Sequence, residues 1–162
     1  MLIRIRDNGK VVYESEFRAL HSNVSFPFPI SLDLLNSFGA DPVFEGAAAT
    51  GGTVYQYSMQ AGVEQINNQW YTKYILGPVF TDNSDATAAT QEAAYKAAKD
   101  AEQAKNIRDT RTQRLSDCDW TQLADSPSAN KTAWATYRQA LRDITKQSGF
   151  PWNVTWPTAP GA

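Results

Sequence analysis

One long alanine-rich segment, residues 82–115, constrains the fold more than any other feature of this sequence. It contains no glycine and no proline. Alanine has the highest helix propensity, so the segment predicts a single long helix that begins with an N-cap near Ser84. Its apolar stripe is thin, because alanine buries little surface and only Tyr95, Ile107 and Leu115 add bulk. Such a helix either bridges two modules, which we favour, or associates with copies of itself.

The residues before this helix, 1–81, predict a small β-rich module with one short helix. The Asn-Gly pair at positions 8–9 lies between LIRIR and VVYES and predicts a hairpin with a type I′ turn. The prolines of FPFPI hold that segment extended. Ser31 is expected to cap a short helix that ends at Gly39. Strands are expected in DPVF, TVYQYSMQ and QWYTKYIL.

The residues after the long helix, 117–162, predict a helical module with an aromatic C-terminal tail. Ser126 followed by Pro127 is a typical helix start, and Gly149 is a typical end. Apolar side chains recur between them at intervals of three and four, which indicates one buried face formed by Trp134, Tyr137, Leu141 and Ile144. Overall the sequence predicts an α+β protein in three parts, 1–81, 82–116 and 117–162.

Two arginines on the predicted C-terminal helix need a compensating charge. Arg138 and Arg142 are four residues apart, where like charges repel. We favour a structural clamp in which nearby carboxylates fold back onto them, and the candidates are Asp117, Asp119 and Asp125. The alternative is an acidic or aromatic surface on a partner protein.

Composition excludes several functional classes. A net charge of −2 and a pI near 5.3 argue against nucleic-acid binding. The short apolar runs predict neither a membrane span nor a signal peptide. No phosphate-binding loop, metal-ligand spacing or nucleophile elbow is present, so we expect no cofactor and no metal. The remaining enzymatic hypothesis is a hydrolase that uses Cys118 and His21, and the aspartates beside Cys118 disfavour the thiolate that it needs.

Three blocks near the C-terminus resemble the phage tail assembly chaperone family. They are DCDWTQLADSP, AWATYRQALRDI and GFPWNVTWP, in that order, and they span about residues 114–157. Cys118 departs from the pattern, which more often has an acidic residue there, and Trp152 is an additional aromatic. The first half is similar, more loosely, to modules of phage tail-fibre and fibre-accessory proteins.

The resemblance implies a non-enzymatic protein that binds a tail-fibre or baseplate subunit and helps it assemble in the host cytoplasm. Large rigid side chains suit such an interface, so the candidate contacts are Trp134, Tyr137, Arg138, Arg142, Phe150, Trp152 and Trp156. The tail tryptophans either dock on the partner or fold back over the C-terminal helix and complete a small core. The rigid long helix favours a protein that remains in the virion as a joint or tip, and the alternative is a purely transient chaperone.

Overall fold

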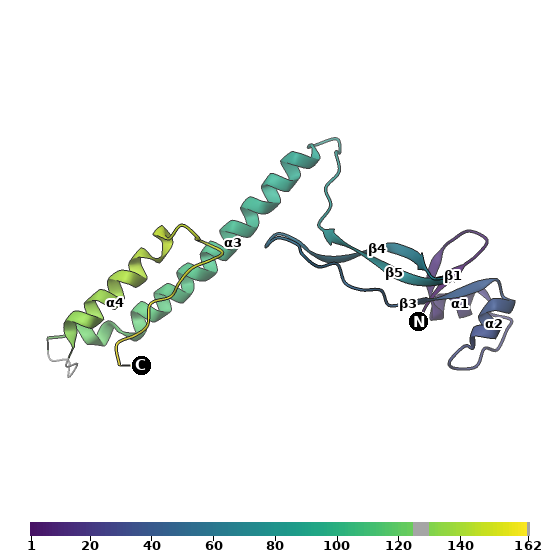
Figure 1. The fold of residues 1–162 in the computed structure, drawn as a ribbon, viewed down its shortest axis with the longest axis horizontal. Coiled ribbons are helices and arrows are strands. Elements are labelled where there is room, and N and C mark those ends of the chain that lie inside the picture. The colour runs from purple at the N-terminus through teal and green to yellow at the C-terminus, as the bar shows by residue number, and fades with distance from the viewer. Residues whose placement is uncertain (125–129, 162) are drawn as a thin grey trace. The chain divides into compact units, whose positions relative to one another are not determined.

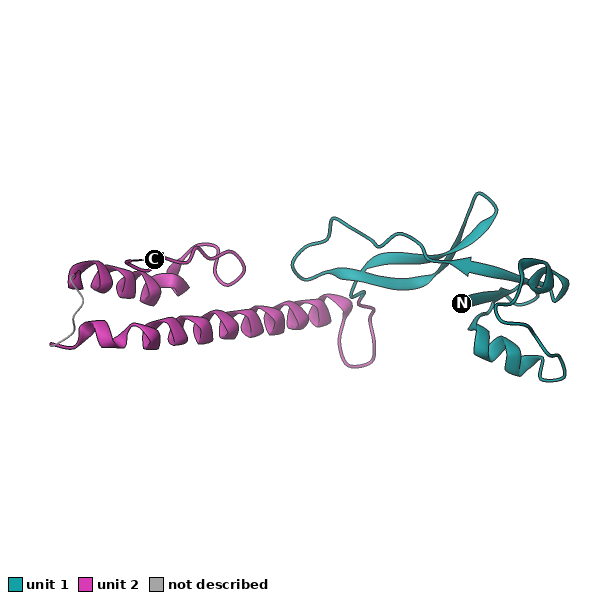
Figure 2. Ribbon diagram, turned by 90° about the horizontal axis from the view of Figure 1, so that it is seen from below, with its two compact units in different colours: residues 1–79 teal, residues 80–162 magenta. Residues whose placement is uncertain are grey.

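The computed structural model describes residues 1–124 and 130–161, which divide into two compact units, Met1–Val79 and Phe80–Ala162 (Figure 2). We call them unit 1 and unit 2. Unit 1 contains the described strands and two short helices, whereas unit 2 is helical. This combination confirms the α+β prediction.

Unit 1 is built on a five-stranded sheet with two helices. Its elements, shown in Figure 1, are β1 Leu2–Ile5, β2 Val11–Tyr13, α1 Glu14–Leu20, α2 Leu32–Ser37, β3 Ala40–Phe44, β4 Tyr57–Ile66 and β5 Gln69–Gly77. The strand order is β2-β1-β3-β5-β4. The β3–β5 pair is parallel and the other neighbouring pairs are antiparallel.

The core of unit 1 comes from its first forty residues. Phe17 of α1, Leu35 of α2 and Ile3 of β1 are completely buried, and they form one cluster with Val12, Phe26, Ile30 and Ala40. The sequence pattern does not predict α1, because the apolar residues of VVYES predict a strand through its start. The helix begins where the backbone N–H of Tyr13 donates to Glu16 Oε2 at 3.0 Å.

One of the turn predictions is wrong. β1 and β2 pair as expected, but in the turn at 8–9 only Gly9 has a positive φ, of 70°. A type I′ turn needs positive φ at both central residues. That requirement is met between β4 and β5, where Asn67 and Asn68 have φ values of 48° and 62°. Ser31 caps α2 as predicted, since its side chain accepts from the N–H of Leu34.

Unit 2 consists of the long helix α3, Ala88–Asp117, followed by the 3-10 helix η1, Asp119–Gln122, the helix α4, Lys131–Asp143, and the 3-10 helix η2, Ile144–Lys146. Figure 1 shows α4 lying along the C-terminal half of α3, and the C-terminal tail following the same helix.

The start of α3 differs from prediction. α3 begins at Ala88 and is capped by Thr87, whose side chain accepts from the N–H of Thr90 at 3.2 Å, and not by a residue near Ser84. Ser126 and Pro127 lie outside the described residues. α4 begins at Lys131, where the side chain of Asn130 accepts from Ala133 N.

Candidate functional site

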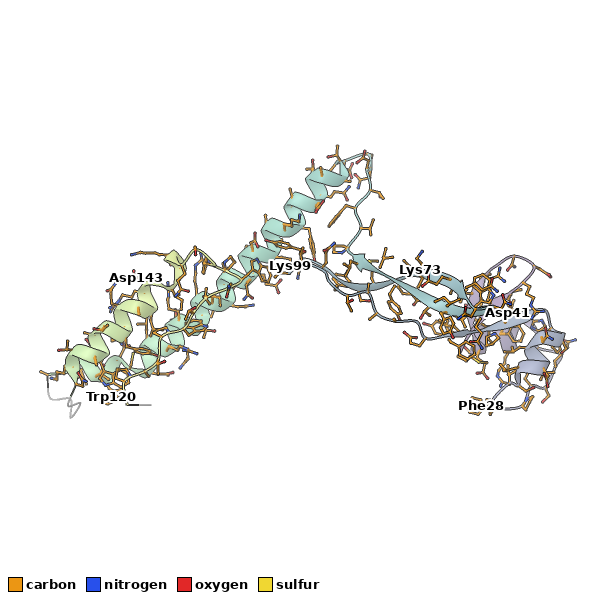
Figure 3. The ribbon with its side chains drawn as sticks, in the orientation of Figure 1. Phe28, Asp41, Lys73, Lys99, Trp120 and Asp143 are labelled. Atoms are coloured by element: carbon orange, nitrogen blue, oxygen red, sulfur yellow. The ribbon has the colours of Figure 1, made fainter. Side chains whose placement is uncertain are left out.

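Aromatic side chains gather where η1 meets α4. The ring centroids of Trp120 and Trp134 are 6.1 Å apart, and Tyr137 lies edge-on to Trp134 at 5.7 Å. Helical spacing places Trp134 and Tyr137 on the same face of α4, and the short η1 brings Trp120 to them. Tyr137 is buried, whereas Trp120, labelled in Figure 3, is 47% exposed. The cluster therefore extends from the interior of unit 2 to its surface.

A buried arginine ties η1 and the end of α3 to α4. Arg138 is only 7% exposed, and its Nη2 lies 2.7 Å from Oδ1 of Asp119. Its Nη1 donates to the carbonyl of Leu115 at 2.8 Å and to Sγ of Cys118 at 3.1 Å. The Leu115 carbonyl is in the last turn of α3, where it also accepts from the N–H of Cys118 at 3.3 Å. Arg138 therefore closes the end of α3 and joins it to α4.

Electrostatics favour the charged form of this arginine. Burial acts to lower the pKa of Arg138, but the hydrogen bonds to Asp119 and Cys118 outweigh it, so the pKa lies above the usual value for arginine. A buried charge needs such partners, because an unpaired charge in the interior is strongly unfavourable. Asp117, in contrast, is exposed and accepts from Gln113 Nε2 at 2.7 Å. Asp125 lies outside the described residues.

The thiol of Cys118 is part of the same interior. Cys118 is 3% exposed, and its Sγ lies 3.1 Å from the Arg114 carbonyl and 3.3 Å from the Leu115 carbonyl. Reactive cysteines are normally accessible as well as activated. His21 lies in unit 1, where its ring packs 4.6 Å from Phe17 and its Nδ1 is 3.0 Å from the Phe17 carbonyl. Each of these two residues thus has a packing role within its own unit.

The aromatic tail is held along α3 by charged side chains. The guanidinium carbons of Arg108 and Arg114 lie 5.4 and 4.4 Å from the ring centroids of Phe150 and Trp156, respectively. Trp152 donates its indole N–H to Asp100. All three tail aromatics are half-buried, and Trp156 also packs on the cluster of Cys118, Tyr137 and Leu141. The tail therefore folds back, mainly onto α3.

The predicted contact residues thus fall into three groups by exposure. Tyr137 and Arg138 are buried, Arg142 is exposed, and Trp134 and the tail aromatics lie between these extremes. Two exposed side chains, Trp120 and Leu123, are not among the contacts predicted from the sequence. Both are in the DWTQL block that supports the family resemblance, so this motif could have indicated them as candidate contacts. Their exposed fractions, 47% and 58%, are known only from the structure.

The described residues contain no group of three or more histidine, cysteine, aspartate or glutamate side chains placed to hold a metal ion. No helix within the described ranges is long and apolar enough to cross a membrane.

Unit 2 is thus a helical unit whose aromatic side chains extend from its interior to its surface. Residues 104–161 match the family model described as phage tail assembly chaperone protein. The match confirms the resemblance over this segment, which runs from the C-terminal half of α3 through the tail. The description of this family refers to phage tail assembly. No curated protein and no solved structure matches the chain.

Proposed function

We propose that this protein binds a tail-fibre or baseplate subunit of a phage, aids its assembly in the host cytoplasm and remains in the virion as a joint or tip. The observation that supports this proposal most strongly is the match of residues 104–161 to the tail assembly chaperone family. Those residues include the aromatic cluster and both arginines of α4. A purely transient chaperone that leaves before the virion is complete is the second candidate.

We further propose that the docking surface is centred on Trp120, Leu123 and Trp134, with Arg142 at its rim. Trp120 and Leu123 are large apolar side chains with about half of their surface exposed. Tryptophan and arginine dominate binding energy at protein interfaces. The buried side of the same cluster, Tyr137 with the Arg138–Asp119 ion pair, would hold the surface rigid, which lowers the entropy lost on binding.

The test is co-expression of the full chain with each fibre and baseplate subunit encoded by the same phage, followed by co-purification. Trp120→Ala is expected to weaken the complex by roughly 2 kcal/mol or more, the usual loss for an interfacial tryptophan. The free protein should stay folded and lose less stability than the complex loses affinity, because only part of the Trp120 ring packs on Trp134. Phe28→Ala is the matched control, because it removes an 87% exposed aromatic ring from unit 1. Equal co-purification of both variants at wild-type level would refute this docking surface.

Virion retention is tested separately by quantifying the protein in purified phage particles. A stoichiometric amount relative to the fibre or baseplate subunit supports the joint or tip role. Its absence from particles that nevertheless assembled only in its presence supports the transient chaperone. If particles assemble equally well without the protein, both forms of the proposal fail.

A further inference from the structure

The β4–β5 hairpin of unit 1 has two faces that differ in what covers them. Directly paired residues in an antiparallel ladder project to the same side, so the register sorts the side chains. One side, which we call the covered face, includes Ser58, Thr72, Tyr74 and Leu76. The other, which we call the open face, includes Tyr57, Met59, Glu64, Ile66, Tyr71, Lys73 and Ile75, together with Phe44 of β3, which pairs with Tyr71.

The chain itself covers the first of these faces. In the segment that joins β3 to β4, Gly46 N donates to Thr72 Oγ1 at 2.7 Å and Ala49 N donates to Ser58 Oγ at 2.9 Å. Gly46 lies so close to β5 that a Cβ there would be 1.9 Å from the Thr72 carbonyl oxygen. Tyr74 donates to Glu45 on the same side. The connecting segment therefore packs along the covered face.

The open face continues a surface that is buried elsewhere in unit 1. Ile3 of β1 pairs with Pro42 of β3, so both project to the side of the sheet that bears Phe44 two residues later. Ile3 is completely buried in the core cluster with Phe17 of α1 and Leu35 of α2. Phe44, further along β3 on the same side, is 40% exposed. Figure 1 shows that β4 and β5 extend away from the two helices, so the helices cover this face only over the first strands.

The open face leaves large apolar side chains in water. Tyr57 is 55% exposed and Ile66 is 48% exposed, while Met59, Tyr71 and Ile75 are half-buried. β5 pairs with β3 only at Trp70 and Tyr71, so most of the hairpin is a two-stranded ribbon. Such a ribbon is at best marginally stable in water unless an apolar face packs on something. The connecting segment already packs on the covered face, so the open face is the apolar surface of the hairpin that is left for a further contact.

Charge and area on this face fit a second copy of the same chain. β4 and β5 contain two charged residues, Glu64 and Lys73, one of each sign, and both are exposed on the open face (Lys73 is labelled in Figure 3). In a two-fold contact each residue pair occurs twice, so Glu64 of one copy can meet Lys73 of the other. The six large apolar side chains of this face leave roughly 400–500 Å² exposed, and the exposed Glu64 and Lys73 add roughly 150 Å². The face can therefore bury about 600 Å² per copy, near the ~800 Å² of a standard interface.

We propose that two copies of this protein associate through the open faces of their β4–β5 hairpins, sheet against sheet, with reciprocal Glu64–Lys73 contacts. The contact is isologous, so it closes as a dimer and does not propagate into a filament. It is independent of the docking surface on unit 2 and would hold whether or not that proposal is correct.

The test is the mass of the purified full chain in solution, measured by light scattering and sedimentation over a concentration series. A dimer is expected at about 10 µM, within the affinity range of interfaces of this size. Tyr57→Lys should raise the dissociation constant at least tenfold, because it places an uncompensated charge in the apolar contact. Gln60→Lys is the control, since it adds the same charge on the same strand at an exposed residue of the covered face.

Charge exchange gives the sharper measurement. Glu64→Lys alone and Lys73→Glu alone each create like-charge pairs across the contact and should weaken the dimer about tenfold or more, whereas the double variant should restore it. These residues are exposed, so the comparison does not depend on a variant that disturbs folding. A protein that is monomeric at about 100 µM, far above that affinity range, would overturn the proposal. So would a dimer whose mass is the same in the wild type, both single variants and Tyr57→Lys, since it would be formed elsewhere, for example along α3.

Discussion

Unit 1 and unit 2 bury their side chains by different means. The interior of unit 1 is an apolar cluster in which Ile3, Phe17 and Leu35 have no exposed surface. The interior of unit 2 includes a charged arginine and a thiol beside Tyr137 and Leu141, and charged side chains of α3 hold its tail. A helix as rich in alanine as α3 offers little apolar area, so its partners are held through guanidinium groups and ring faces. Polar and cation–π contacts in unit 2 thus provide stabilisation that the small apolar surface of α3 does not.

The largest expected effect is in unit 1. Phe17→Ala should destabilise the protein by about 3–5 kcal/mol, because it leaves a cavity in a closed apolar core. Hydrogen exchange of the full chain can measure this loss separately for β1 and for α4. Exchange should accelerate in β1. Phe28→Ala, which removes an exposed ring, should leave exchange unchanged. Equal acceleration in α4 would show that the two units share one folding transition. The view that each unit is stabilised by its own interior would then be wrong.

The next largest loss of stability is expected in the polar interior of unit 2. Arg138→Ala removes the ion-pair partner of Asp119 and one of the donors to the Leu115 carbonyl, which still accepts from the N–H of Cys118. We expect a loss of about 2 kcal/mol, at the lower end for a buried pair because Asp119 itself is largely exposed. Arg142→Ala, one turn further along α4 and exposed, is the matched control and should change stability by less than about 0.5 kcal/mol. Similar melting temperatures for the two variants would contradict a structural role for Arg138.

A smaller effect is expected for the tail. Trp156→Ala removes a half-buried ring that packs on the unit 2 cluster and under Arg114. A loss of about 1–2 kcal/mol in chemical denaturation is expected, less than for a fully buried tryptophan. Trp156→Phe should recover part of it, because a phenylalanine ring still packs there. If Trp156→Ala melts like the wild type but no longer co-purifies with a tail subunit, the tail is a docking element and not part of the core.

The smallest effect is a pH dependence at the end of α4. Hydrogen bonds from Lys146 and Gln139 hold the pKa of Asp143 below its usual value. A carboxyl whose folded pKa is lower than its unfolded pKa stabilises the fold above the unfolded value, and this contribution is lost as pH falls through the folded pKa. A carboxyl titration followed by NMR should show the pKa of Asp143 rising in Lys146→Ala. An unchanged titration curve would mean that the ion pair is not formed in solution.

Local signals predicted much of each unit. Absence of glycine and proline predicted α3. Alternation and turn residues predicted the strands, although the strand expected in TVYQYSMQ, residues 53–60, is β4 at Tyr57–Ile66. Helical spacing predicted the burial of Tyr137, Leu141 and Ile144, whereas Trp134 of the same stripe is half-buried. The errors occurred where two local signals competed. The apolar run before α1 suggested a strand through residues that fold as a helix, and the Asn-Gly pair at 8–9 suggested a type I′ turn that the chain forms at Asn67–Asn68 instead.

By itself, then, the sequence determined the element types, the α+β class and the family resemblance over the C-terminal segment, because propensity, periodicity and motif spacing are local properties. Only the tertiary structure decided which aromatic and charged side chains face inward. Arg138 is buried and Arg142 exposed although they stand one turn apart, and the reason is that Leu115, Cys118 and Asp119 meet only one of them. Burial and pairing depend on residues distant in the chain, and no local pattern specifies them.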